Sequence, residues 1–316
     1  MIAPQPELFV LRDPDRPADP PRLSIIVPAF NEVDRLPVLL TDLASTDIGR
    51  DAGTEILIVD DGSSDGTARA AEQAGSWTPR LRVIRHSANQ GKGAAVRTGV
   101  LAAHGELIAF LDADNATDLA ALGPMCDAIG GRVGAVFGSR HAPGATVEGA
   151  PSIRGVMGRV FNHVVRFAAG TSISDTQCGA KVFWAPAARL VFAASEIDGF
   201  AFDVDVLRRL MALGVGVVEY PVRWHHVPGT KVGLLTPLRM LRDIAVIRLR
   251  AARIDQRGID CVDSEALRTV AAPIVPSATV GGGGVGRVIV TPPSSLAAVT
   301  ATLHGAGVDV IDQVRT

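Results

Sequence analysis

The sequence lacks the features of a nucleic-acid-binding, secreted or membrane-spanning protein. Its 31 Lys and Arg residues are offset by 33 Asp and Glu residues, giving a formal net charge of −2, so no overall basic field attracts nucleic acid. No apolar run reaches about 18 residues, the length that a spanning helix needs. The first residues show no basic start followed by an apolar core, so no signal peptide is expected. We therefore expect a cytoplasmic protein that meets a membrane only at its surface, on the cytoplasmic face.

Cysteine is also scarce. The chain has three cysteines, Cys126, Cys178 and Cys261, which are far apart and form no C-x-x-C pair. This excludes a disulfide framework and a zinc site of the usual spacing. Cys178 is expected to be a small packed residue rather than a nucleophile, because only Lys181 nearby in sequence could lower its pKa.

Short apolar runs alternate with helix-like segments in the first third of the chain. This rhythm predicts an α/β fold, a doubly wound, Rossmann-like sheet flanked by helices. The dinucleotide-binding version is excluded, because no G-x-G-x-x-G follows the first strand, and no P-loop spacing is present. Expected strands are 23–28, 55–59, 81–84 and 107–111, and expected helices are 36–43, 67–74 and about 93–104.

Two carboxylates follow the 107–111 strand. Residues i and i+2 of a strand share a face, so Asp112 and Asp114 can aim at one point at the strand end, where ligands bind in such sheets. Oxygen ligands suit Mg²⁺ or Mn²⁺ carrying a phosphorylated ligand. The alternative is a solvated turn.

A glycine pair opens the helix before that strand. Gly91 and Gly93 flank Lys92, and two interpretations stay open. The glycines can simply give flexibility at a helix start, or the backbone amides and Lys92 can face a phosphate.

Four motifs follow one another in the first half of the chain: Ile26-Val27-Pro28-Ala29-Phe30-Asn31-Glu32, Val59-Asp60-Asp61-Gly62-Ser63-Ser64-Asp65-Gly66-Thr67, Asn89-x-Gly91-Lys92-Gly93 and Asp112-Ala113-Asp114. In this order they resemble the nucleotide-sugar half of inverting family-two glycosyltransferases of GT-A fold. Further motifs downstream are Gly138-Ser139-Arg140, 175–181, 200–203 and 229–231. These are similar to motifs of the dolichyl-phosphate or polyprenyl-phosphate sugar synthases, and more to their glucosyl than their mannosyl branch.

The resemblance implies a donor site and a mixed sheet. Asp112 and Asp114 would hold the metal, and Glu32 and Asp61 would accept hydrogen bonds from base and ribose. The remaining donor-site residues would be Pro28, Phe30, Val59, Lys92 and Ala113. The mannosyl branch has a Gln ligand two residues after its second Asp, but here that position is Ala116. Water or another side chain, such as Asn115, would then complete the cation's shell.

The second half carries the acceptor residues. A lipid phosphate is already largely dianionic at neutral pH, so it needs cationic side chains to position it; a sugar hydroxyl would instead need a carboxylate base. Asp203 and Asp175 are candidate bases, although either could be a turn or N-cap residue. We expect Arg140 to act in catalysis and in acceptor binding. The other predicted acceptor residues are Arg154, Gln177 and Lys231.

Two basic amphipathic stretches, 153–168 and 234–253, predict peripheral contact with an anionic membrane. The alternative is an ordinary surface helix packed on the core. Around these stretches the expected domain organisation is an irregular lead-in over 1–21, a GT-A domain over 22–255, a linker over 256–284 and a small β-α-β appendage over 285–316. The donor half would span 22–125 and the acceptor half 126–255.

Together these features predict a metal-dependent inverting transferase that moves a hexose from a nucleotide sugar to a polyprenyl phosphate. UDP-glucose is the first choice of donor. The alternatives are a GDP-mannose enzyme, a transferase to a sugar hydroxyl, and a nucleotide-sugar-binding protein without turnover.

Overall fold

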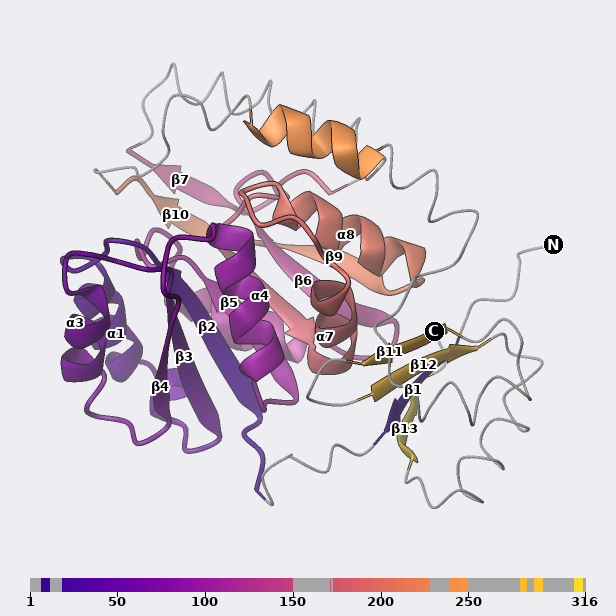
Figure 1. The fold of residues 1–316 in the computed structure, drawn as a ribbon, viewed down its shortest axis with the longest axis horizontal. Helices are drawn as coiled ribbons and strands as arrows, with labels where there is room; N and C mark the ends of the chain where they lie inside the picture. The colour runs from indigo at the N-terminus through magenta and orange to yellow at the C-terminus, as the bar shows by residue number, and fades with distance from the viewer. Residues whose placement is uncertain are drawn as a thin grey trace.

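The structure is a computed structural model that describes residues 7–11, 19–149, 171, 173–227, 239–248, 279–282, 287–291 and 310–314. Its centre is a seven-stranded sheet with the strand order β4-β3-β2-β5-β8-β6-β9 (Figure 1). The strands are β2 (Leu23–Ala29), β3 (Thr54–Asp60), β4 (Leu81–Arg85), β5 (Leu107–Leu111), β6 (Val133–Ser139), β8 (Ala180–Trp184) and β9 (Gly216–Pro221).

The sheet is mixed, as the motif resemblance implied. Strands β4, β3, β2 and β5 are parallel, and they contain the four strands predicted from the sequence. Strand β8 runs antiparallel to both β5 and β6, while β6 and β9 are parallel. The predicted helix 67–74 matches α3 (Thr67–Ala74), and the other two predicted helices correspond to α1 (Leu36–Ser45) and α4 (Lys92–Ala102).

Helices cover both faces of the sheet, and each face has its own core. Alternate residues of a strand point to opposite faces, so Ile26 packs in one cluster and Ile25 and Val27 in the other. The first cluster lies under α4, α7 (Ala185–Ala193) and α8 (Phe202–Ala212), and includes residues of the helical segment 239–248. The second lies under α1, α3 and α5 (Leu122–Asp127). The shorter elements are α2 (Asp47–Arg50), a 3₁₀ turn (Leu119–Ala121), and the parallel pair β7 (Thr146–Glu148) and β10 (Arg223–His225).

A second sheet joins the two ends of the chain. Strand β1 (Glu7–Leu11) pairs antiparallel with β12 (Arg287–Thr291) and with β13 (Val310–Val314), and β12 also pairs with β11 (Thr279–Gly282). This sheet lies beside α7 (Figure 1). The expected irregular lead-in and linker are therefore wrong at 7–11 and at 279–282. Pairing between strands far apart in sequence leaves no local signal that would have shown this.

Candidate active site

The loops after β2, β3 and β5 meet at one edge of the central sheet. The backbone amide of Asn31 donates to Ser63 Oγ at 2.9 Å, and that of Glu32 donates to Thr67 Oγ1 at 2.8 Å. Lys92, at the start of α4, pairs with Asp112 across 2.7 Å between Nζ and Oδ1. The acidic ends of these three strands therefore lie at the same edge of the sheet.

Asp112 lies where the segment 22–125 contacts the segment 126–255. Its backbone amide donates to the carbonyl of Gly179 at 2.9 Å, which joins the end of β5 to the loop before β8. A Cβ on Gly179 would lie 2.6 Å from Asp112 Oδ2, so a residue without a side chain is needed beside this carboxylate. Burial alone would lower the pKa of Lys92, but Asp112 and Asp203 raise it, so Lys92 stays charged.

Asp112 and Asp114 form a pair of carboxylates suited to a cation. Burial and the charge of Asp112 raise the pKa of Asp114. Both side chains are partly exposed, and two carboxylates that repel each other are stabilised when a cation binds between them. The charge of Arg35 acts on both acids.

The rest of a metal shell is not built from acidic or imidazole side chains. Among the described residues, no group of three or more His, Cys, Asp and Glu side chains gathers around one point. Asn115, considered above as a further ligand, donates from Nδ2 to Asp42 of α1, so only its Oδ1 could serve as a ligand. Water and phosphate oxygens would supply the remaining coordination, as is common for Mg²⁺.

Glu32 is held by a residue that the sequence analysis missed. Arg35 Nε donates to Glu32 Oε2 at 2.6 Å, and a second bond joins Arg35 Nη2 to Glu32 Oε1. Burial opposes the charge on Arg35, but the bond to Glu32 raises its pKa. A basic residue three positions after Glu32, where a helix begins, was the available signal. The bidentate pair fixes the Glu32 carboxylate at the rim of the site.

Asp61 is a buried junction rather than an open acceptor. Its carboxylate accepts hydrogen bonds from Asn89 Nδ2 and from the backbone amides of Gln90 and Gly91, at 2.8 to 2.9 Å. His86 Nδ1 lies 2.7 Å from Asp61 Oδ1. Protein groups therefore occupy the Asp61 carboxylate, which was expected to accept hydrogen bonds from the base and ribose of a nucleotide. Asp61 instead shapes the loop that leads into α4.

The amides at the start of α4 are also occupied. Those of Gln90 and Gly91 donate to Asp61, and those of Gly93 and Ala94 donate to the carbonyl of Asp198. These four amides are therefore not available to a phosphate. Lys92 remains as the cation at this position.

The other predicted donor-site residues differ in exposure. Phe30 is 39% exposed, so its ring is available to a ligand, whereas Pro28 is buried at the end of β2. Ala113 is buried. The Val59 side chain is fully buried in the core, so only its backbone could meet a ligand.

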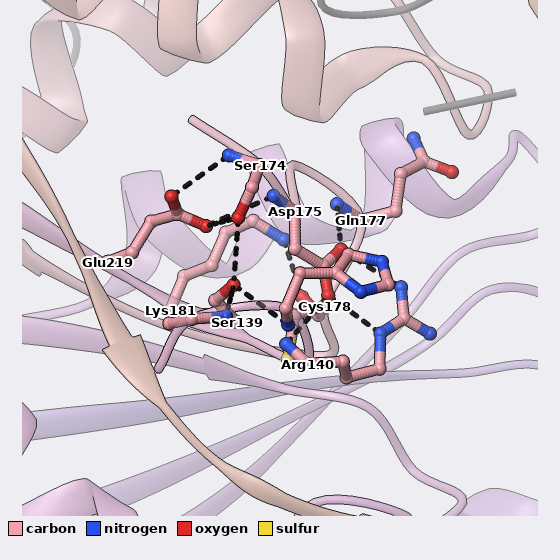
Figure 2. Close-up of polar contacts among 10 residues, drawn as sticks. Ser139, Arg140, Ser174, Asp175, Gln177, Cys178, Lys181 and Glu219 are labelled. Atoms are coloured by element: carbon pink, nitrogen blue, oxygen red, sulfur yellow. Dashed lines mark hydrogen bonds and ion pairs between the residues drawn. The ribbon is translucent and has the colours of Figure 1, made fainter. Parts of the chain in front are cut away.

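Arg140, directly after β6, forms a partly buried ion pair with Asp175 in the loop before β8 (Figure 2). Asp175 Oδ2 accepts from Arg140 Nε at 2.7 Å and from its backbone amide at 3.0 Å, and Oδ1 accepts from Nη2 at 2.9 Å. Burial would raise the pKa of Asp175, but Arg140 lowers it. Asp175 thus has the surroundings of a residue that orients Arg140, and those surroundings oppose its expected alternative role as a base.

Arg140 keeps part of its guanidinium for a ligand. Its side chain is 26% exposed, and the group lies 5.6 Å from the centroid of the Trp224 ring. Gln177, predicted to contact the acceptor, lies on the same loop as Asp175, and its backbone amide donates to Asp175 Oδ1 at 3.2 Å.

Cys178 is 1% exposed. Burial raises the pKa of its thiol, so its predicted role as a packed residue is confirmed.

Asp203 is paired inside the protein. Lys181 Nζ lies 2.9 Å from Asp203 Oδ1 and donates to the carbonyl of Cys178 at 2.6 Å. Asp203 lies in the first turn of α8, and Ala201 is the N-cap, so the N-cap alternative is wrong. Burial raises the pKa of Asp203, while Lys181 and Lys92 act against that rise.

Some predicted residues cannot be placed. Arg154, Lys231 and the stretch 153–168 lie outside the described residues. Of the stretch 234–253, residues 239–248 form a helix whose Met240, Ile244 and Ile247 are buried. Among the described residues, no helix combines the length and apolarity that crossing a membrane requires.

Comparison with known proteins identifies the family. The family model described as glycosyl transferase family 2 matches residues 24–189, more than half of the chain. This chain belongs to glycosyl transferase family 2. Similar members are named dolichyl-phosphate beta-glucosyltransferase. The one from Drosophila melanogaster is 35% identical over 246 residues, which cover 72% of this chain and 74% of the relative. The one from Dictyostelium discoideum is 33% identical over 248 residues, covering 74% and 76%.

Solved structures agree with this assignment at the level of the fold. Glucosyl-3-phosphoglycerate synthase from Mycobacterium tuberculosis, in complex with UDP, matches with a TM-score of 0.53 at 19% identity, over 73% of this chain and 79% of that one. Mannosyl-3-phosphoglycerate synthase from Rubrobacter xylanophilus matches with a TM-score of 0.51 at 20% identity, over 82% and 81%. The family-2 chain is thus a glycosyltransferase of GT-A fold, and the resemblance seen in the motifs is confirmed.

Proposed function

We propose that this glycosyltransferase moves glucose from UDP-glucose to a polyprenyl phosphate, with inversion and with Mg²⁺ or Mn²⁺ at Asp112 and Asp114. The relatives named dolichyl-phosphate beta-glucosyltransferase support both the sugar and the acceptor. The observation that carries the proposal is the position of Arg140. Arg140 is paired with Asp175, and the loop that carries Asp175 reaches Asp112 through the hydrogen bond from the Asp112 amide to the Gly179 carbonyl.

The donor side would neutralise the leaving group. In this proposal the acceptor oxygen attacks the anomeric carbon, the bond from that carbon to the diphosphate breaks, and UDP leaves with the electron pair. A bound divalent cation would stabilise negative charge on the diphosphate. Lys92 is buried and charged beside Asp112, so it can contribute to the same stabilisation. The Phe30 ring is accessible to the base of the donor.

The acceptor side would position a phosphate rather than activate a hydroxyl. A phosphate monoester has its second pKa near about 6, so it needs no base at neutral pH. Asp175 is paired with Arg140, which lowers its pKa, and Asp203 is buried against Lys181. Neither carboxylate is exposed as a base for a hydroxyl. Arg140 would bind the phosphate together with Gln177, and with Arg154 and Lys231 from outside the described residues. These surroundings favour phosphate over a sugar hydroxyl.

Membrane contact completes the proposal. The described part of the stretch 234–253 is a helix whose buried residues pack on the core, while Arg239, Leu241 and Arg242 are exposed. A basic surface with an exposed leucine suits the interface of an anionic membrane. We place the enzyme at the cytoplasmic face of a membrane, where a lipid phosphate would be available.

A matrix of donors and acceptors tests the proposed function. UDP-glucose and GDP-mannose are each incubated with a short-chain polyprenyl phosphate or a free sugar acceptor, with and without Mn²⁺. We expect product only from UDP-glucose and polyprenyl phosphate with the metal present. Equal use of GDP-mannose would refute the donor, transfer to the sugar alone would refute the acceptor, and UDP-glucose binding without any product would indicate a binding protein.

A further inference from the structure

Glu219 of β9 holds the backbone of the loop that carries Asp175 (Figure 2). Its Oε2 accepts from the amide of Ser174 at 2.9 Å, and its Oε1 accepts from Ser174 Oγ at 2.5 Å and from the amide of Asp175 at 3.1 Å. Burial alone would raise the pKa of Glu219, but these bonds lower it. An ionised carboxylate thus binds three donors from two consecutive residues.

The same contacts extend to the turn that carries Arg140. Ser174 Oγ lies 3.3 Å from Ser139 Oγ, and Ser139 Oγ accepts from the amides of His141 and Ala142 at 3.2 and 3.0 Å. Strand β9 runs parallel to β6, where Ser139 is the last residue. Glu219 is therefore linked to both segments around the ion pair, the turn with Arg140 and the loop with Asp175.

The orientation of Arg140 depends on these links. Asp175 binds Nε and Nη2 of the guanidinium, which leaves Nη1 and the outer edge of the group for a ligand. A shift of the loop would move Asp175 and turn that edge away. Outer-shell partners of this kind are typically worth about 10- to 100-fold when they are removed from metal sites, and small misplacements of binding groups can reduce rates strongly.

We propose that Glu219 is a positioning residue for the acceptor phosphate, acting through Ser174 and Asp175 on Arg140. This inference rests on the proposed function, in which Arg140 binds that phosphate. Glu219 is itself negatively charged, so at long range it repels an anionic acceptor. Its contribution must therefore come from the position in which it holds Arg140. The two effects predict opposite changes in the acceptor KM when the charge of Glu219 is removed.

The variant Glu219→Gln separates geometry from charge. It keeps the size of the side chain but replaces one acceptor oxygen by an NH₂ group. This group cannot accept hydrogen bonds from Ser174 or Asp175, so at least one of the three bonds is lost. If geometry dominates, the KM for polyprenyl phosphate rises by roughly tenfold, while the KM for UDP-glucose stays within about twofold. If repulsion dominates, the acceptor KM falls. Glu72→Gln is the matched control, because Glu72 is exposed on α3 and its substitution removes the same charge.

The variant Arg140→Ala distinguishes failure of the inference from failure of the proposed function. If Arg140→Ala leaves the acceptor KM unchanged, the role of Arg140 is refuted, and the inference with it. If Arg140→Ala raises that KM but Glu219→Gln does not, only the inference is overturned. Equal rises in both the donor and the acceptor KM of Glu219→Gln also overturn it, since they indicate a general structural defect. In the Arg140→Ala background, Glu219→Gln is expected to add no further loss.

A milder change covers the case in which Glu219→Gln does not fold. Ser174→Ala removes only the hydroxyl between Glu219 and Ser139, and keeps both backbone bonds. We expect a rise of about threefold in the acceptor KM with an unchanged donor KM. An unchanged acceptor KM in this variant, with intact folding by circular dichroism, would overturn the inference.

Discussion

The buried pair of Lys181 and Asp203 gives a sharp prediction about stability. Their side chains are 1% and 6% exposed, and the two charged groups lie 2.9 Å apart. Lys181 Nζ lies 5.2 Å and 5.3 Å from the ring centroids of Phe110 and Phe137. The variant Lys181→Met keeps an unbranched side chain beside these rings and removes the charge. Breaking a buried pair by removing one partner costs about 3–5 kcal/mol. We expect a loss of about 3 kcal/mol or more in the free energy of unfolding at pH 8.

The pH dependence of this loss follows from Asp203. Burial raises its pKa, and Lys181 opposes the rise, so without Lys181 the pKa rises further. As the pH falls through that folded-state pKa, the folded variant takes up a proton, whereas the unfolded chain stays ionised until about pH 4. Binding of a proton to the folded state alone stabilises it. The loss relative to the unmodified protein should therefore shrink from pH 8 to pH 5.

Urea unfolding followed by tryptophan fluorescence measures both effects, because the chain has three tryptophans. The double variant Lys181→Met/Asp203→Leu is the matched control, since it leaves no buried charge unpaired. It should recover much of the stability at pH 8. A loss below about 1 kcal/mol, or a loss equal at pH 5 and pH 8, would refute the reasoning about this pair.

Three further predictions follow from the described contacts. Asp61→Asn should weaken UDP binding in calorimetry by about tenfold, because the loop 89–91 loses its ionised acceptor; unchanged affinity would contradict the role of Asp61. Deletion of residues 1–11 removes β1 from the middle of the second sheet, so limited proteolysis should then cleave the last 40 or so residues faster, and equal cleavage would contradict that pairing. In a Cys261→Ser variant, iodoacetamide should not modify the native protein at pH 8, because Cys126 and Cys178 are buried and burial raises the pKa of Cys126 to about 11; rapid alkylation would contradict their burial.

Local patterns were enough to predict the donor half. The apolar run 107–111 followed by Asp112 and Asp114 marked a strand end, and the order of such ends in a parallel sheet brought the acidic loops to one edge. The helix 67–74 was predicted to the residue. These features depend on neighbours in sequence, which is why a single sequence shows them.

Long-range pairings were not predictable in the same way. The side chain of His86 is 8% exposed and contacts Asp61 and Thr98, and no sequence motif indicates these contacts. Glu219 lies in an ordinary strand sequence with no motif around it, and only the fold brings its carboxylate to the Ser174 amide. Burial on one sheet face also decided that the Val59 side chain belongs to the core. Such contacts join residues tens of positions apart, so no local period or motif signals them.

The central claim is that Asp112, Asp114 and Arg140 form one active site, and Asp114→Asn tests it most directly. The measurement is the rate of glucosyl transfer from UDP-glucose to a short-chain polyprenyl phosphate with Mn²⁺, compared with UDP affinity in the same preparation. We predict that the rate falls by at least about a hundredfold, with a much smaller loss of UDP affinity. A transfer rate that stays within a few-fold of the unmodified enzyme would contradict the account.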